Sequence, residues 1–145
     1  MYGKVFTTLA ALASVVAATT LTTSNGRPLT AGHGILIGAA FDVSAEAGYF
    51  PKAPGFDVTC PAYYVYDNEP ATGTECSWDG EQPKNNKVYA YTNYDTLAVT
   101  LRHEWAGEGG VTYVTTAVGK LASRPKYNQD IPPFSLTVSK TATKL

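Results

Sequence analysis

The chain has 145 residues, of which eleven are basic and twelve are acidic, and its net charge at pH 7 is −1. This length is sufficient for one domain with a buried core. Because there is no surplus of basic residues to neutralise phosphates, the composition argues against a nucleic-acid partner and against a polybasic membrane-binding patch.

The first 18 residues have the three parts of a secretory signal peptide. Lys4 supplies a positive charge, residues 5–16 are mostly apolar, and small residues follow, which places cleavage after Ala18. The apolar run is shorter than the roughly 20 residues that span a bilayer, so a membrane anchor is disfavoured. We therefore expect a secreted, extracellular protein that has no membrane association after cleavage.

The alternation of apolar and polar residues and the positions of Gly and Pro predict the order of strands and loops. Residues 19–34 are polar and rich in Thr and Gly, so we expect a flexible N-terminal segment there. Residues 35–145 have the pattern of a single β domain. Apolar and polar residues alternate at 41–44 and 56–60, as in half-buried strands, and Pro and Gly predict a loop at 48–55.

The second half of the chain contains the clearest pattern, a β-hairpin. Residues 97–105 alternate strictly, glycines follow at 107–110, and a β-branched run returns at 111–118. Further strands are predicted at 88–94 and 134–138. With no helical periodicity beyond the signal peptide, the sequence predicts an all-β fold, a small antiparallel β-barrel or sandwich.

Cys60 and Cys76 are the two cysteines of the chain. The secretory route is oxidising, so one intramolecular disulfide is the default, with free thiols or an intermolecular bridge as the alternatives. Alternation at 56–60 points Cys60 into the core. Closing a loop of this length stabilises a fold by about 3 kcal/mol.

Few residues could carry catalysis. His33 and His103 are distant in sequence and lack metal-ligand spacing, so we predict no metal, no cofactor and no catalytic residue. We interpret His103, on the apolar face of a predicted strand, as an interior histidine with satisfied hydrogen bonds. If two carboxylates were to cleave a glycoside, Asp79 and Glu81 would be the best candidates in the sequence. The simpler interpretation is that both lie in a solvated turn.

The tyrosines say more about function than the candidate catalytic residues do. Tyr63 and Tyr64 are neighbours on one predicted strand and cannot both face the core, so some tyrosines must be exposed. Exposed tyrosines can bind a ligand or partner, although cross-strand pairing that stiffens the sheet is the simpler explanation. The candidate surface residues are Tyr64, Tyr66, Trp78 and Tyr91.

Several of these elements together resemble a known family, the fungal Alternaria major-allergen family. The resemblance covers roughly residues 41–139 and depends on the order of residues 56–60, Cys76, 97–101, 111–117 and 134–138. It implies a small secreted β-barrel of the allergen, effector or elicitor kind, extracellular or cell-wall-associated and without catalytic activity. It also implies recognition of host or other extracellular proteins, or of small aromatic ligands.

This chain departs from the family pattern in its cysteines. It lacks the family's second internal disulfide, and it lacks the N-terminal cysteine that links the founding allergen into a dimer, so no disulfide-linked dimer is expected. The leading hypothesis is a secreted interaction protein that acts through its β-barrel surface. A structural cell-wall protein is the second hypothesis, and a small carboxylate-based hydrolase is the third.

Overall fold

The computed structural model describes residues 19–66 and 72–144, with side chains as far as residue 139. The predicted signal peptide, residues 1–18, lies outside the described residues. In the described part the regular structure is β throughout, apart from single-turn 3₁₀ helices at Gly32–Gly34 and Glu108–Gly110. The strands are β2 (Thr20–Thr22), β3 (Ser24–Thr30), β4 (Leu36–Ala45), β5 (Phe56–Val65), β6 (Thr74–Glu75), β7 (Ser77–Trp78), β8 (Asn86–Asn93), β9 (Ala98–Ala106), β10 (Thr112–Lys120) and β11 (Ser135–Lys144).

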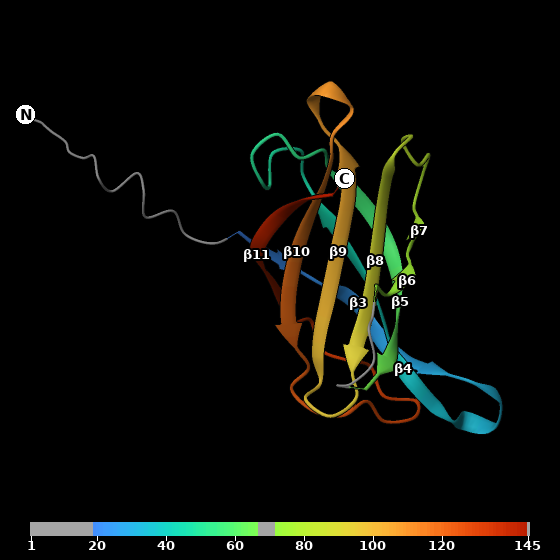
Figure 1. Cartoon of the computed structure of the whole chain (residues 1–145). Coiled ribbons are helices and arrows are strands. Elements are labelled where there is room, and N and C mark those ends of the chain that lie inside the picture. The colour runs from blue at the N-terminus through green and yellow to red at the C-terminus, as the bar shows by residue number, and fades with distance from the viewer. Residues whose placement is uncertain (1–18, 67–71, 145) are drawn as a thin grey trace, which may run out of the picture.

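The strands form one sheet that curls into a nearly closed barrel (Figure 1), which confirms the all-β prediction and selects the barrel over the sandwich. The strand order is β2-β11-β10-β9-β8-β5-β4-β3, with β6 added to β8 and β7 added to β5. Neighbouring strands are antiparallel except for β5 and β8, which are parallel where Tyr64 lies beside Thr92.

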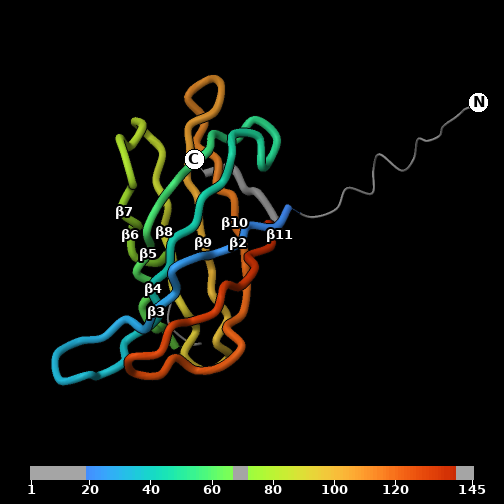
Figure 2. The backbone as a smooth tube through the Cα atoms, turned by 180° about the vertical axis from the view of Figure 1, so that it is seen from behind, coloured from blue at the N-terminus to red at the C-terminus, as the bar shows by residue number. Residues whose placement is uncertain are grey.

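Barrel closure depends on the strands at the two ends of this order. β2 and β3 are separated along the chain by Thr23 alone, so one extended segment pairs with β11 at one edge and with β4 at the other. The backbone N–H of Thr23 donates to the carbonyl of Phe134 at 3.0 Å, and the Thr23 hydroxyl accepts from the Phe134 N–H at 3.0 Å. Gly26 pairs with Ile131 further along. Figure 2 shows this blue segment crossing the back of the barrel.

The structure therefore corrects the prediction of a flexible segment at 19–34. Residues 20–30 are strands, and Leu21 and Thr23 are buried. The segment looked like a loop because its Thr, Ser and Gly side chains are polar, but its backbone groups are used to close the barrel. The β domain thus includes residues 20–30 and does not begin at residue 35.

The predicted hairpin is confirmed as β9 and β10, which pair from Ala106 with Thr112 to Ala98 with Lys120. Gly109 and Gly110 in its turn have φ values of 72° and 75°, a region in which residues with a Cβ are strained. Alternate side chains of β9 point into the barrel, as do those of β5. The buried set on these two strands is Phe56, Val58, Cys60, Ala62, Val99, Leu101, His103 and Trp105.

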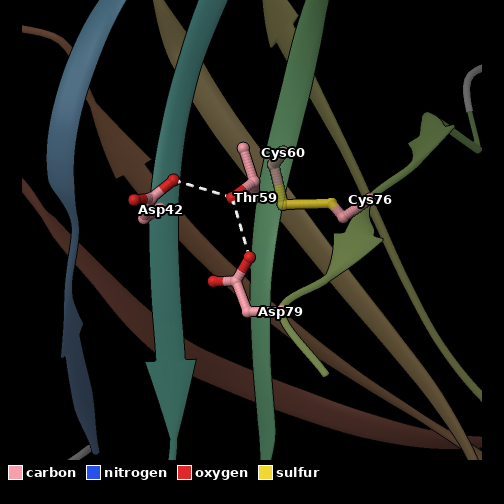
Figure 3. Close-up of a disulfide and its surroundings, with 5 residues drawn as sticks. All are labelled: Asp42, Thr59, Cys60, Cys76 and Asp79. Atoms are coloured by element: carbon pink, nitrogen blue, oxygen red, sulfur yellow. Dashed lines mark hydrogen bonds between the residues drawn. A yellow bond between two sulfur atoms is a disulfide. The ribbon is translucent and has the colours of Figure 1, made fainter. Parts of the chain in front are cut away.

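The predicted disulfide is also confirmed. Cys60 in β5 is joined to Cys76, between β6 and β7, with a Cα–Cα distance of 4.3 Å (Figure 3). Cys60 is fully buried and Cys76 is 3% exposed. The Cys76 N–H also donates to the carbonyl of Val88 at 2.7 Å. The bridge therefore fastens the short strands β6 and β7 to the barrel wall.

Replacing both cysteines together, C60A/C76A, should lower the free energy of unfolding by about 3 kcal/mol, because the unfolded chain regains the entropy of a 16-residue loop. Urea unfolding at pH 7 measures the loss, and reduction of the unaltered protein should reproduce it. A difference below about 0.5 kcal/mol in both experiments would contradict a stabilising role for the bridge.

Candidate functional site

A cleft of about 650 Å³ opens at the end of the barrel that is uppermost in Figure 1, here called the upper cleft. It lies between the loop of residues 46–55, which connects β4 to β5, and the turn of the β9–β10 hairpin. Both loops project from this end in Figures 1 and 2. The lining residues are Phe50, Pro51, Lys52, Trp105, Ala106, Gly107, Glu108 and Tyr113.

Aromatic rings form one wall of the upper cleft. Trp105 and Tyr113 are stacked, with ring centroids 4.8 Å apart and an angle of 22° between the rings. The Trp105 indole N–H donates to the Thr115 hydroxyl at 3.0 Å, which fixes the orientation of the indole. The Tyr113 ring lies so close to Gly107 that a Cβ there would be 2.3 Å from it. Glycine at position 107 is thus required for the ring to lie against the hairpin turn.

The rim of the cleft is polar. Lys52 Nζ on the 46–55 loop lies 3.7 Å from Glu108 Oε2 on the hairpin turn, and both side chains are largely exposed. An ion pair in this setting contributes little to stability because water screens it. It links the two loops across the mouth and leaves the interior of the cleft without a buried charge.

A buried chain of hydrogen bonds lies inside the barrel at this same end. His103 Nδ1 is 2.6 Å from Tyr49 Oη, and His103 Nε2 is 2.6 Å from Asn86 Oδ1. An amide oxygen can only accept, so Nε2 carries the proton and Nδ1 accepts from the Tyr49 hydroxyl. The Phe56 ring lies against the imidazole, with centroids 4.8 Å apart. His103 is 1% exposed and, as expected, is an interior histidine with both nitrogens satisfied.

Burial controls the ionisation of this chain. It lowers the pKa of His103 from 6.5 to about 4, because a buried imidazolium loses its hydration. Burial also raises the pKa of Tyr49 to about 12, an effect that a hydrogen bond with Thr115 partly offsets. Both groups are neutral at pH 7. Since His103 faces no open space and both its nitrogens are occupied, it is not placed to act as a general base.

The four predicted surface residues do not form one surface. Tyr64 and Tyr66 lie at the opposite, lower end of the barrel, where each ring centroid is 5.1 Å from that of Tyr94. Trp78 packs against the core from β7, and Tyr91 lies half-buried on β8. The indole N–H of Trp78 is buried and has no hydrogen-bond partner among the described residues.

The lower end carries an aromatic cluster that sequence reasoning found only in part. The Arg124 guanidinium lies 4.3 Å from the ring centroid of Tyr94 and 6.0 Å from that of Tyr64. Burial raises the pKa of Tyr64, and Arg124 counteracts this by favouring the phenolate. Tyr64 belongs to the inward-facing set of β5, so it caps the barrel end rather than standing on the outer wall.

The carboxylates considered for hydrolysis lie away from the upper cleft. Asp79 lies next to Thr59, whose hydroxyl donates to Asp42 Oδ1 at 2.8 Å and lies 3.5 Å from Asp79 Oδ1 (Figure 3). Hydrogen bonds from Asn25 and Thr59 lower the pKa of Asp42. Glu81 is exposed, and neither it nor Asp79 lines the upper cleft.

Sequence reasoning missed the upper cleft. Its residues come from a loop rich in Pro and Gly and from the two strands of a hairpin, and none belongs to a recognisable motif. The one available signal was Trp105, an aromatic residue at the last inward position of β9, directly before the turn. A bulky residue at that position lies at the end of a barrel and not in its middle.

Comparisons with known proteins add no relatives, since no family model, no curated protein and no solved structure matches the sequence. In the described part of the chain, no helix is long and apolar enough to cross a membrane. Within the same residues, no group of three or more His, Cys, Asp or Glu side chains is placed to hold a metal ion.

The buried state of His103 makes stability depend on pH. The unfolded chain protonates this histidine near pH 6.5, whereas the folded chain resists protonation until about pH 4. The contribution of neutral His103 to the free energy of unfolding is fully present above pH 6.5. It falls by roughly 3 kcal/mol in total as the pH drops to 4. Urea unfolding from pH 7 to pH 4 measures the loss.

Carboxylates also titrate in this range, so the informative quantity is the difference between variants. H103Q should lose the His103 component and show a shallower decline, while H33Q, at an exposed position, should follow the unaltered protein. Identical slopes for H103Q and the unaltered protein would contradict a buried neutral imidazole.

Proposed function

We propose that this chain is a secreted, non-catalytic interaction protein that binds a small, largely apolar aromatic ligand in the upper cleft. The observation that carries the proposal is the make-up of the cleft: stacked Trp105 and Tyr113 along one wall, Phe50 and Pro51 on the facing loop, and charge confined to the rim. Ligand pockets are commonly apolar and aromatic, with a few polar groups that orient the ligand.

The size of the cleft supports a ligand rather than a solvent-filled irregularity. A volume of about 650 Å³ is within the range of small-molecule sites and accommodates two or three fused or linked rings. Among the described residues, its lining contains no Ser, Thr, Cys or His that could act as a nucleophile or base, and the acid found there, Glu108, is paired with Lys52. Binding is therefore better supported than catalysis.

Secretion is part of the proposal. The signal-peptide pattern at residues 1–18 favours export, and the Cys60–Cys76 disulfide is typical of an oxidising compartment. The resemblance to a family of fungal extracellular allergens and elicitors agrees with both. A structural cell-wall role would require neither a ligand cleft nor an ordered lining, and no observation favours the Asp79–Glu81 hydrolase.

A second candidate is recognition of another extracellular protein through the lower end. The observation that favours it is the cluster of Tyr64, Tyr66, Tyr94 and Arg124. Tyrosine and arginine are enriched at the energetic centres of protein interfaces, and Tyr66 is 50% exposed. This candidate needs no ligand in the upper cleft.

Titration with N-phenyl-1-naphthylamine, an uncharged probe that becomes fluorescent in apolar sites, tests the ligand proposal. We expect one site per chain with a Kd of about 10 µM, given the binding energy available to a ligand of this size. Y113A should weaken binding about tenfold because it removes an aromatic wall. P51W, which fills the mouth from an exposed position, should abolish it.

Y91A is the matched control, since it removes the same side chain from the outer wall of β8, and it should leave the Kd unchanged. Circular dichroism establishes that each variant is folded. Absence of saturable probe binding, or equal loss in Y91A and Y113A, would overturn the ligand proposal and leave the lower end as the better candidate.

A further inference from the structure

The loop that lines one side of the upper cleft has a defined shape of its own. Within residues 46–55, Gly48 N–H donates to the Ala53 carbonyl at 2.8 Å, and Ala53 N–H donates to the Phe50 carbonyl at 2.9 Å. Gly48 and Lys52 adopt left-handed backbone conformations, with φ values of 87° and 68°. Because these backbone hydrogen bonds lie within the loop, a change in its position need not change its shape.

Different side chains of this loop face opposite directions. Phe50, Pro51 and Lys52 line the cleft, whereas Tyr49 turns into the barrel and meets His103. The Tyr49 ring also packs edge-on against Phe56, with centroids 5.6 Å apart. Tyr49 therefore connects the cover of the cleft to the barrel interior.

Other contacts also attach the loop to the barrel. Phe50 packs against the core, Ala53 is buried, and the Tyr49 hydroxyl hydrogen-bonds with Thr115 as well as with His103. Lys52 and Glu108 form an exposed pair that water screens. The Thr19 hydroxyl donates to the Tyr49 carbonyl at 2.8 Å, from the first described residue of the chain. The Tyr49 hydroxyl, bonded to His103 at 2.6 Å and also to Thr115, is the polar group of the loop that reaches the barrel interior.

We propose that residues 46–55 form a lid over the upper cleft, that the hydrogen bond between Tyr49 and His103 latches it closed, and that protonation of His103 releases the latch. The inference rests on the proposed function, because it takes the covered cleft as the ligand site. It adds a means of control, in which a ligand bound at neutral pH is released in acid.

Release by acid follows from the surroundings of His103. An imidazolium at this position would have no negative partner, because the only titratable group that contacts it among the described residues is the neutral phenol of Tyr49. The groups that face it are Tyr49 from the lid, Phe56 from β5, Asn86 and Val88 from β8, Trp105 from β9 and Thr115 from β10.

A buried cation without a counter-charge is stabilised most by water. Trp105 and Thr115 are on strands paired on both sides, and Asn86 is paired with Trp105 of β9, so moving their backbone would break sheet pairing. Tyr49 is on the lid, and lifting the lid admits water to the ring without breaking the sheet. The depressed pKa of His103, about 4, agrees with this cost of protonation in the closed state.

Hydrogen exchange of the full folded protein, followed by mass spectrometry, tests the lid without any ligand. At pH 7, Y49F should raise the exchange rate of amides in residues 46–55 at least tenfold, while amides of β9 and β10 stay protected. In the unaltered protein, the same segment should lose protection between pH 6 and pH 4 after correction for intrinsic exchange rates.

Two further variants make the outcome decisive. Y63F, the same change on the exposed outer side of β5, should leave lid exchange unaltered. H103Q should make lid exchange independent of pH in this range, and it provides the test should Y49F fail to fold. Unchanged exchange of residues 46–55 in Y49F, or pH-dependent exchange that persists in H103Q, would overturn the latch.

The two proposals can fail separately. Probe binding without a change of lid exchange in Y49F would retain the ligand site and refute the lid. A lid that opens in Y49F, in a protein that binds no aromatic probe, would retain the latch and refute the ligand proposal.

Discussion

One extended segment, residues 20–30, joins the two edges of the sheet, and the barrel has an interior because of it. Thr23 makes the junction, since its backbone and hydroxyl both bond to Phe134. An open sheet would leave β11 and β4 with unpaired edges and would expose the side chains of β5 and β9. The nearly closed barrel instead surrounds a core of apolar side chains.

This buried interior determines the chemistry of both ends. At the upper end it keeps His103 neutral and strengthens its hydrogen bonds to Tyr49 and Asn86, because buried polar groups that lose water must be paired. The aromatic residues above them then line a cleft. At the lower end, Tyr64 and Tyr94 close the barrel beneath Arg124. Binding surfaces thus arise where the sheet ends and side chains meet water.

The sequence predicted the elements that are governed by local rules. Strict alternation from Val99 to Trp105 and a glycine-rich turn are sufficient to identify the β9–β10 hairpin. Alternation likewise placed Cys60 inward, where the structure joins it to Cys76. These features depend on side-chain period and turn chemistry, which can be read from a few neighbouring residues.

Features that depend on distant contacts could not be predicted. Residues 20–30 are polar and become ordered through backbone pairing with β4 and β11, which side-chain pattern does not encode. Tyr64 and Tyr91 were grouped by residue type, but one caps a barrel end and the other lies on the wall. Tyr49 was unremarkable in a loop of Gly and Pro, and its importance comes from His103, 54 positions away.

The latch requires that His103 be neutral, protonated at Nε2 and sealed from water. Two-bond ¹H–¹⁵N correlation spectra of the imidazole groups, recorded from about pH 7 to pH 5, measure this directly. The expected result for His103 is an Nε2–H tautomer with a slowly exchanging proton and no titration over that range. An Nδ1–H tautomer, or titration with a midpoint near 6.5 as for an exposed histidine, would contradict the account.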